Sequence, residues 1–219
     1  MDILLAGGTG LVGRAALAEL MHRGGHRVRA LVRRPGALPA SVELPFDFDD
    51  LSAYDRVLSE QRPDIVLCAL GTTLRAAGSA EAFRTVDLDY PARLMSASAR
   101  LAPRAVFGLV SSLGADRPRG LYLTVKAQAE AALTATDLRH VILRPSLLLG
   151  PRQDFRPGEA LAQALAPAYL ALARAFPRSE GLWRYAPIPA ESVGIALVRA
   201  CLDAPPASGG LILEGRALR

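Results

Sequence analysis

The chain has 219 residues, of which 51% are hydrophobic and 21% charged, so it is long enough and apolar enough to bury a sizeable core. Its net charge of +5 comes from 26 Lys and Arg residues against 21 Asp and Glu residues. The arginines are scattered along the chain, which favours a solvated surface over a nucleic-acid partner.

No apolar run approaches the length of a membrane span, because the stretch 161–175 is interrupted by Pro167 and carries Arg174. The first residues predict a strand and not a signal peptide. Cys68 and Cys201 lie in apolar surroundings without a Cys-x-x-Cys spacing, which indicates small core residues in a reducing compartment. We therefore expect a cytoplasmic protein with no metal site and no membrane partner.

A glycine-rich turn follows the first predicted strand, 3–6, and precedes a helical pattern that begins at Leu11. Backbone N–H groups in such a turn and the dipole of the following helix favour a pyrophosphate. The glycines fit the dinucleotide fingerprint as Gly8-x-Gly10-x-x-Gly13, or as Gly7-x-x-Gly10-x-x-Gly13. A turn with a purely structural role is the alternative. The candidate cofactor-binding residues of this turn are Gly7, Thr9, Gly10, Leu11, Val12 and Gly13.

Strand and helix patterns then alternate with short loops, which predicts an α/β fold of the Rossmann type: a doubly wound parallel sheet with helices on both faces. We expect a single domain over residues 1–219, with 151–190 and 203–219 forming a small substrate-facing lobe. The strands are predicted at 27–32, 42–46, 64–70, 105–110, 141–143 and 211–213; the helices at 51–58, at 80–101 with an interruption near Pro91, and at 121–136, 159–176 and 190–202.

Arg33 and Arg34 end the second strand, about twenty residues after the glycine turn, where an acidic side chain would bind a ribose 2′-hydroxyl. A guanidinium group binds a 2′-phosphate instead, so these residues favour NADP(H) over NAD(H). A solvent-exposed basic turn is the alternative. Asp47, after the third strand, is a candidate for the adenine amino group, with Phe48 supplying its backbone; a helix-capping aspartate is the other interpretation.

Tyr122 and Lys126 are four residues apart in a predicted helix and therefore share one face. A free phenol, with a pKa near ~10, is a poor acid or base at neutral pH, and a nearby cation favours the phenolate. The helix follows a strand that ends in Ser111-Ser112, which puts the pair at the carboxyl edge of the sheet. An ordinary surface pair is the alternative.

The glycine turn, the Ser-Ser strand end and the Tyr-x-x-x-Lys helix together resemble the short-chain dehydrogenase/reductase superfamily over essentially the whole chain. Within it, Leu31-Val32-Arg33-Arg34-Pro35, residues 69–73, residues 110–116 and Leu143-Arg144-Pro145 look most like the atypical NAD(P)-binding branch around the Tat-interacting proteins and their bacterial epimerase/dehydratase-like relatives.

The resemblance implies roles for individual residues. Tyr122 would be the acid/base, Lys126 would assist it and hold the nicotinamide ribose, and Ser112, with Ser111 as the alternative, would hydrogen-bond the substrate oxygen. Leu70, Gly71, Thr72 and Pro145 would line the path of the cofactor. The chain contains no asparagine for the proton relay of many relatives; Asp87 occupies the corresponding helix, and we expect a water to complete the relay.

These patterns predict an NADPH-dependent oxidoreductase, monomeric or homodimeric, that transfers hydride to or from a small carbonyl or alcohol substrate. The alternative is an NADP(H)-sensing regulator or adaptor with little turnover. A nucleotide-sugar epimerase or dehydratase ranks third, because the stretch after Gly150 is short for a nucleotide-recognition lobe.

Overall fold

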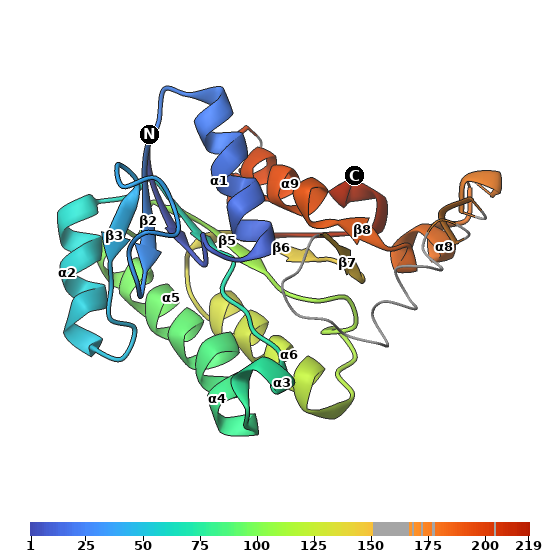
Figure 1. Cartoon of the computed structure of the whole chain (residues 1–219), viewed down its shortest axis with the longest axis horizontal. Coiled ribbons are helices and arrows are strands. Elements are labelled where there is room, and N and C mark those ends of the chain that lie inside the picture. The colour runs from blue at the N-terminus through green and yellow to red at the C-terminus, as the bar shows by residue number, and fades with distance from the viewer. Residues whose placement is uncertain (151–166, 168, 172, 177, 204) are drawn as a thin grey trace.

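A parallel sheet of seven strands runs through the computed structural model, in the order β3-β2-β1-β4-β5-β6-β9 (Figure 1). The structure describes residues 1–150, 167, 169–171, 173–176, 178–203 and 205–219. The strands of this sheet are β1 (Asp2–Ala6), β2 (Arg27–Val32), β3 (Glu43–Pro45), β4 (Ile65–Cys68), β5 (Val106–Val110), β6 (Arg139–Arg144) and β9 (Gly210–Glu214). A separate two-stranded sheet pairs β7 (Leu148–Leu149) with β8 (Ile188–Pro189).

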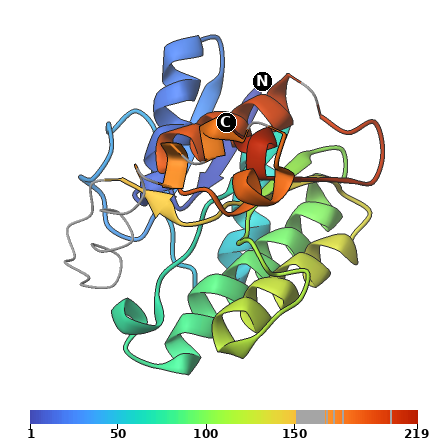
Figure 2. The same ribbon diagram turned by 90° about the vertical axis from the view of Figure 1, so that its right-hand side faces the viewer.

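Helices cover both faces of the large sheet, as Figures 1 and 2 show. One face carries α1 (Leu11–Arg23) and α9 (Ala190–Leu202); the other carries α2 (Leu51–Gln61), α5 (Tyr90–Leu101) and α6 (Gly120–Thr134). The remaining helical segments are α3 (Leu74–Ala77), α4 (Ala80–Arg84), the π-turn η1 (Thr85–Asp89), α8 (Glu180–Tyr185) and η2 (Gly215–Leu218). No helix among the described residues is long and apolar enough to cross a membrane.

The continuous apolar runs of the strands build one core on each face, because successive side chains of a strand point in opposite directions. Ile3 and Leu5 of β1 belong to the cluster beneath α1 and α9, whereas Leu4 and Ala6 belong to the cluster beneath α2 and α5. Strands β4 and β5 divide their side chains in the same way. The Rossmann-type fold predicted from the sequence is confirmed.

Close packing of α1 against α9 fixes the helix that follows the glycine turn. A Cβ at Gly194 would lie 2.6 Å from Ala15 Cβ and 2.6 Å from Ala16 N, so only glycine allows this approach. The amino end of α1 is thereby held at the carboxyl edge of the sheet.

The expected helix over 80–101 is interrupted, but by a π-turn at Thr85–Asp89 that the sequence pattern does not reveal. Pro91 lies in the first turn of α5, directly after the π-helical segment, and offers no N–H for a helical hydrogen bond. The short elements α3, α8, β7 and β8 were not predicted, since they are too short to show a period. The helix predicted at 159–176 lies for most of its length outside the described residues, and the substrate-facing lobe stays a prediction.

Candidate functional site

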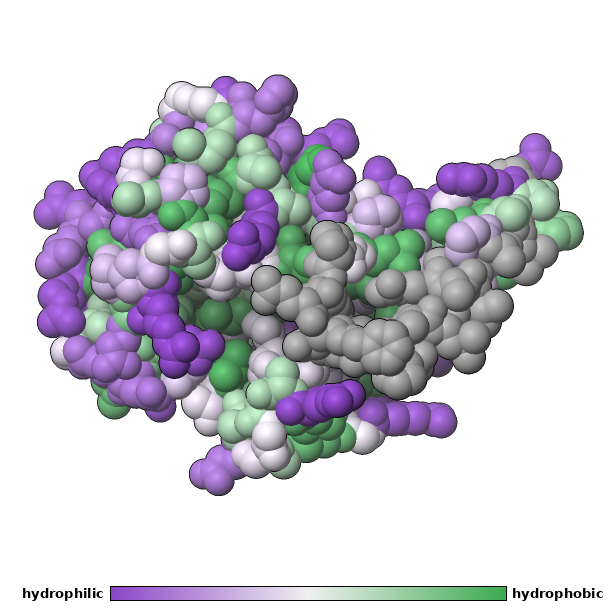
Figure 3. Space-filling model, viewed as in Figure 1, coloured by the Kyte–Doolittle hydropathy of each residue, from purple (hydrophilic) through white to green (hydrophobic). Residues whose placement is uncertain are grey.

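The strand order reverses between β1 and β4, and ligands of doubly wound folds bind at such a switch point. Here the carboxyl ends of β1, β4, β5 and β6 open into a cavity of about 1520 Å³. The described segments that line it include residues 9–12, 69–74, 110–114 and 145–148, together with one face of α6. In the space-filling view, apolar side chains lie in the hollow and hydrophilic ones around its outer edge (Figure 3).

The glycine turn is packed too tightly for any side chain at two of its positions. A Cβ at Gly7, whose φ is +85°, would lie 2.4 Å from the carbonyl carbon of Ala69, and one at Gly13 would lie 2.0 Å from Gly7 O. These two glycines therefore allow the close backbone packing of the turn. The cavity itself is lined by Thr9, Gly10, Leu11 and Val12.

Gly10 is the N-cap of α1 and offers no side chain to the free N–H groups of the first turn. Those donors and the positive end of the helix dipole face the cavity, an arrangement that suits a pyrophosphate. The residues present therefore fit a dinucleotide. The lining also contains Leu70, Gly71, Thr72 and Pro145, as predicted for the cofactor's path.

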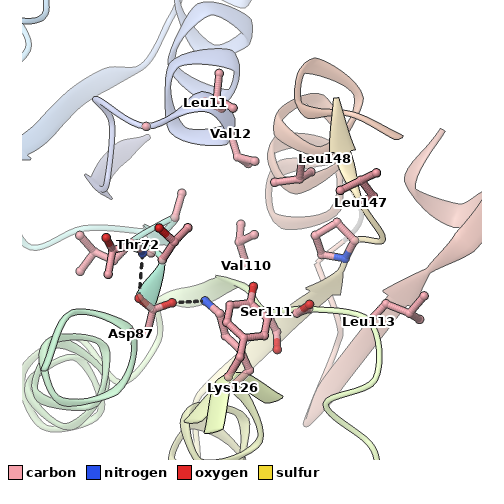
Figure 4. A pocket seen from close by; sticks show the side chains of 18 of the residues that line it. Leu11, Val12, Thr72, Asp87, Val110, Ser111, Leu113, Lys126, Leu147 and Leu148 are labelled. Atoms are coloured by element: carbon pink, nitrogen blue, oxygen red, sulfur yellow. Dashed lines mark hydrogen bonds and ion pairs between the residues drawn. The ribbon is translucent and has the colours of Figure 1, made fainter. Parts of the chain in front are cut away.

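Helix α6 brings the predicted acid/base pair to the cavity. Tyr122 is 38% exposed, and its ring lies 5.6 Å from that of Phe83, whereas Lys126 is buried. Lys126 Nζ forms an ion pair with Asp87 Oδ1 at 2.7 Å. Burial alone would lower the pKa of Lys126, but the Asp87 carboxylate and, next, the Tyr122 phenol outweigh it and raise that pKa. Asp87, which the sequence analysis noted in the helix of the missing asparagine, contacts Lys126 directly (Figure 4).

The two serines at the end of β5 have different surroundings. The buried Ser111 hydroxyl donates to Glu130 Oε1. Glu130 also accepts hydrogen bonds from Arg144: Nε donates to Oε1 at 3.0 Å and to Oε2 at 3.2 Å, and Nη2 donates to Oε2 at 2.6 Å. Ser112 lines the same cavity, and its side chain makes no hydrogen bond with a described residue. Ser112 is therefore the serine whose hydroxyl is available to a ligand.

The sequence analysis missed Glu130 and gave no role to the side chain of Arg144. A signal for them exists: Glu130 follows Lys126 by four residues on the same helical face, and Arg144 directly ends an apolar strand. Hydrogen bonding to Glu130, the largest effect, raises the pKa of Arg144. This buried pair ties α6 to the ends of β5 and β6.

At the other end of the site, Arg33 and Arg34 follow β2 with exposed side chains, and neither forms a salt bridge within the described part of the chain. They lie outside the lining of the cavity. Among the described residues, neither guanidinium group has a salt-bridge partner, and their role toward a 2′-phosphate stays a prediction.

The residues predicted for the adenine side have structural partners. Asp47 Oδ1 accepts a hydrogen bond from Asp49 N at 2.9 Å, and α2 is capped instead by Asp50, so the helix-capping interpretation of Asp47 is wrong. Phe48 is buried, and its carbonyl accepts from the Tyr54 hydroxyl. Neither Asp47 nor Phe48 lines the cavity.

The side of the cavity opposite Lys126 is apolar and is lined by Leu147 and Leu148 (Figure 4), with Leu113 also in the lining. Tyr185 adds an aromatic ring that is 62% exposed. Trp183 is packed beneath Arg216, whose guanidinium carbon lies 4.8 Å from the ring centroid, and it lies outside the lining.

Comparison with known proteins agrees with this geometry. A family model described as NAD(P)H-binding matches residues 7–163. Protein fmp52 of Emericella nidulans is 35% identical over 177 residues, which cover 76% of this chain and 75% of that protein. Protein HTATIP2 of Rattus norvegicus is 42% identical over 122 residues, 53% of this chain and 48% of that protein. The chain belongs to this NAD(P)H-binding family.

Solved structures support the fold. MoeE5 in complex with UDP-glucose and NAD superposes with a TM-score of 0.72 at 22% identity and covers 97% of this chain and 75% of its own. A short-chain dehydrogenase/reductase superfamily protein from Agrobacterium tumefaciens with bound NAD gives a TM-score of 0.71 at 21% identity. The match covers 97% of this chain and 77% of that protein.

One expectation is contradicted by these comparisons. The sequence analysis predicted a cytoplasmic protein, but the fungal relatives are named as mitochondrial proteins, among them that of Emericella nidulans. A reducing environment for Cys68 and Cys201 does not distinguish between the two compartments, so the cysteine argument was too weak to decide.

Proposed function

We propose that this protein is an NADPH-dependent oxidoreductase of the short-chain dehydrogenase/reductase superfamily that acts on a small carbonyl or alcohol substrate, with Tyr122 as acid/base. One observation carries the proposal. Tyr122, Lys126 and Ser112 line the same cavity as the glycine turn and the amino end of α1, so a dinucleotide anchored at the turn can extend toward the phenol.

NADPH, when bound, supplies the hydride for the reduction of the carbonyl. The chain supplies the proton: Tyr122 donates its phenolic hydrogen to the substrate oxygen, or accepts a proton from an alcohol in the reverse direction. Ser112 donates a hydrogen bond to the same oxygen and holds it beside the phenol. General acid/base assistance of this kind contributes about 10²- to 10⁴-fold in rate.

Lys126 remains a buried cation under this mechanism, since its pKa is raised by Asp87. Its ammonium group, one helical turn from Tyr122, can donate a hydrogen bond to the phenol oxygen after proton donation. Lys126 also offers N–H donors to a ribose hydroxyl. Pro145, Leu147 and Leu148 form an apolar part of the same cavity.

A preference for NADPH over NADH rests on Arg33 and Arg34. Each guanidinium can form charge-assisted hydrogen bonds with a 2′-phosphate, and neither has to leave an existing salt bridge in the described structure to do so. Replacing both by alanine is expected to weaken NADPH binding about tenfold or more and to leave NADH binding unchanged, measured by calorimetry. Arg199→Ala, at the exposed far end of α9, is the matched control.

The test of the function is Tyr122→Phe. The variant keeps the ring that packs on Phe83 and loses only the hydroxyl, so NADPH affinity is expected to stay within about threefold while turnover with a panel of carbonyls falls by at least ~100-fold. A wild-type protein that binds NADPH tightly but oxidises it with no carbonyl of the panel would support the sensor or adaptor instead. Failure to bind NADPH or NADH at millimolar concentration would refute both.

A further inference from the structure

A buried carboxylate lies directly beneath the proposed catalytic lysine. The side chain of Asp87 is fully buried, with Oδ1 2.7 Å from Lys126 Nζ and Oδ2 accepting a hydrogen bond from Thr72 N at 2.8 Å. Figure 4 shows both interactions at the floor of the cavity. Asp87 therefore links the loop after β4 to α6 and holds Lys126 from below.

The π-turn explains why an aspartate reaches this position. In η1, the flanking Leu88 is buried in an apolar cluster with Phe83 and Val125, and this packing turns Asp87 toward α6. Gly71 passes over the pair, where a Cβ would lie 3.5 Å from Asp87 Oδ1 and 3.6 Å from Lys126 Nζ. The pair is thus enclosed by the loop that lines the cofactor's path.

As a consequence, the part of the cavity formed by Asp87 and Lys126, called its floor here, carries no net charge. Among the described residues that line the cavity, the charged side chains are Arg14, Asp87 and Lys126, and Arg14 Nε donates to Thr9 O at the glycine turn. The groups that face Lys126 are Asp87 from η1, Tyr122 from α6 and the thiol of Cys68 at the end of β4. A single anion thus balances a single cation at the end of the site that contains the acid/base.

We propose that Asp87 is a positioning residue that holds Lys126 against the Thr72 loop and cancels its charge, so that the site accepts the oxidised and the reduced dinucleotide with similar affinity. This inference rests on the proposed function. NADP⁺ carries a positive charge on its nicotinamide ring and NADPH does not, whereas their phosphates are identical. An unbalanced charge at the floor would therefore change the ratio of the two affinities.

The test measures the dissociation constants of NADP⁺ and NADPH by calorimetry at pH 6.5, without a substrate. In the wild-type protein, the two dissociation constants are expected to differ by no more than about threefold. Asp87→Asn leaves the charge of Lys126 without its counter-charge. This variant is expected to weaken the binding of NADP⁺ relative to that of NADPH on the order of tenfold. Lys126→Met leaves Asp87 unbalanced and shifts the ratio in the opposite direction. The double variant removes both charges, so its ratio returns to the wild-type value even where both affinities are lower.

The protonation of Lys126 can be followed separately, since it is the only lysine in the sequence. In protein labelled with ¹⁵N-lysine its ammonium gives one side-chain signal, which is expected to persist to a higher pH in the wild type than in Asp87→Asn. Opposite shifts of the affinity ratio in the two single variants support the proposal, and if one variant does not fold, the other and the wild-type ratio decide.

Ratios that stay unchanged in the single variants, or shift in the same direction, overturn the role of Asp87 and leave the proposed function standing. A wild-type ratio far from unity does the same. Absence of binding of both dinucleotides to the wild-type protein overturns the proposed function and this inference together.

Discussion

Removal of the Glu130 carboxylate tests how far the buried network beneath the site stabilises the fold. The side chains of Arg144 and Glu130 are 12% and 9% exposed, and Glu130 accepts hydrogen bonds from both Arg144 and Ser111. Glu130→Leu leaves a buried guanidinium without its counter-charge, which costs about 3–5 kcal/mol of unfolding free energy. For a chain of this length, the midpoint of thermal unfolding should fall by roughly 6–20 °C.

The matched control is an exposed pair of the same chemistry. Arg100 and Asp55 form two hydrogen bonds, but their side chains are 55% and 49% exposed, so Asp55→Leu should cost no more than about 1 kcal/mol. Circular dichroism during heating, with urea unfolding for the free energy, compares the two variants. A double variant, Glu130→Leu with Arg144→Leu, should be more stable than Glu130→Leu alone, because no charge remains unpaired. Equal losses for Glu130→Leu and Asp55→Leu would refute the reasoning.

Two further predictions concern the cavity. Gly13→Ala should weaken NADPH binding at least about tenfold by calorimetry, because its Cβ would overlap Gly7 O and displace the turn; unchanged affinity would contradict the anion site. The raised pKa of Lys126 adds stability that is fully present below the unfolded value of 10.5 and is lost as the pH rises through the folded value. The free energy of unfolding measured in urea should therefore fall above pH 10.5, and it should fall by less in Asp87→Asn. An equal fall in the two proteins would contradict the contribution of the ion pair to stability.

The sequence by itself determined the fold and part of the cavity lining. Apolar runs such as Ile3–Ala6, separated by helical periods, allow few arrangements other than a parallel sheet covered on both faces. The glycine turn and the spacing of Tyr122 and Lys126 are local patterns. They can be recognised in the sequence because φ/ψ limits and helical geometry act over only a few residues.

Only the tertiary structure decided which groups meet. The pairing of Asp87 with Lys126 joins residues 39 positions apart through a π-turn that has no signature in residue periodicity. The choice between Ser111 and Ser112 depends on Glu130, which packs against the end of β5 only after α6 has docked on the sheet. Such contacts are set by the packing of whole elements, and a linear pattern carries no record of the distance between two side chains once the chain has folded.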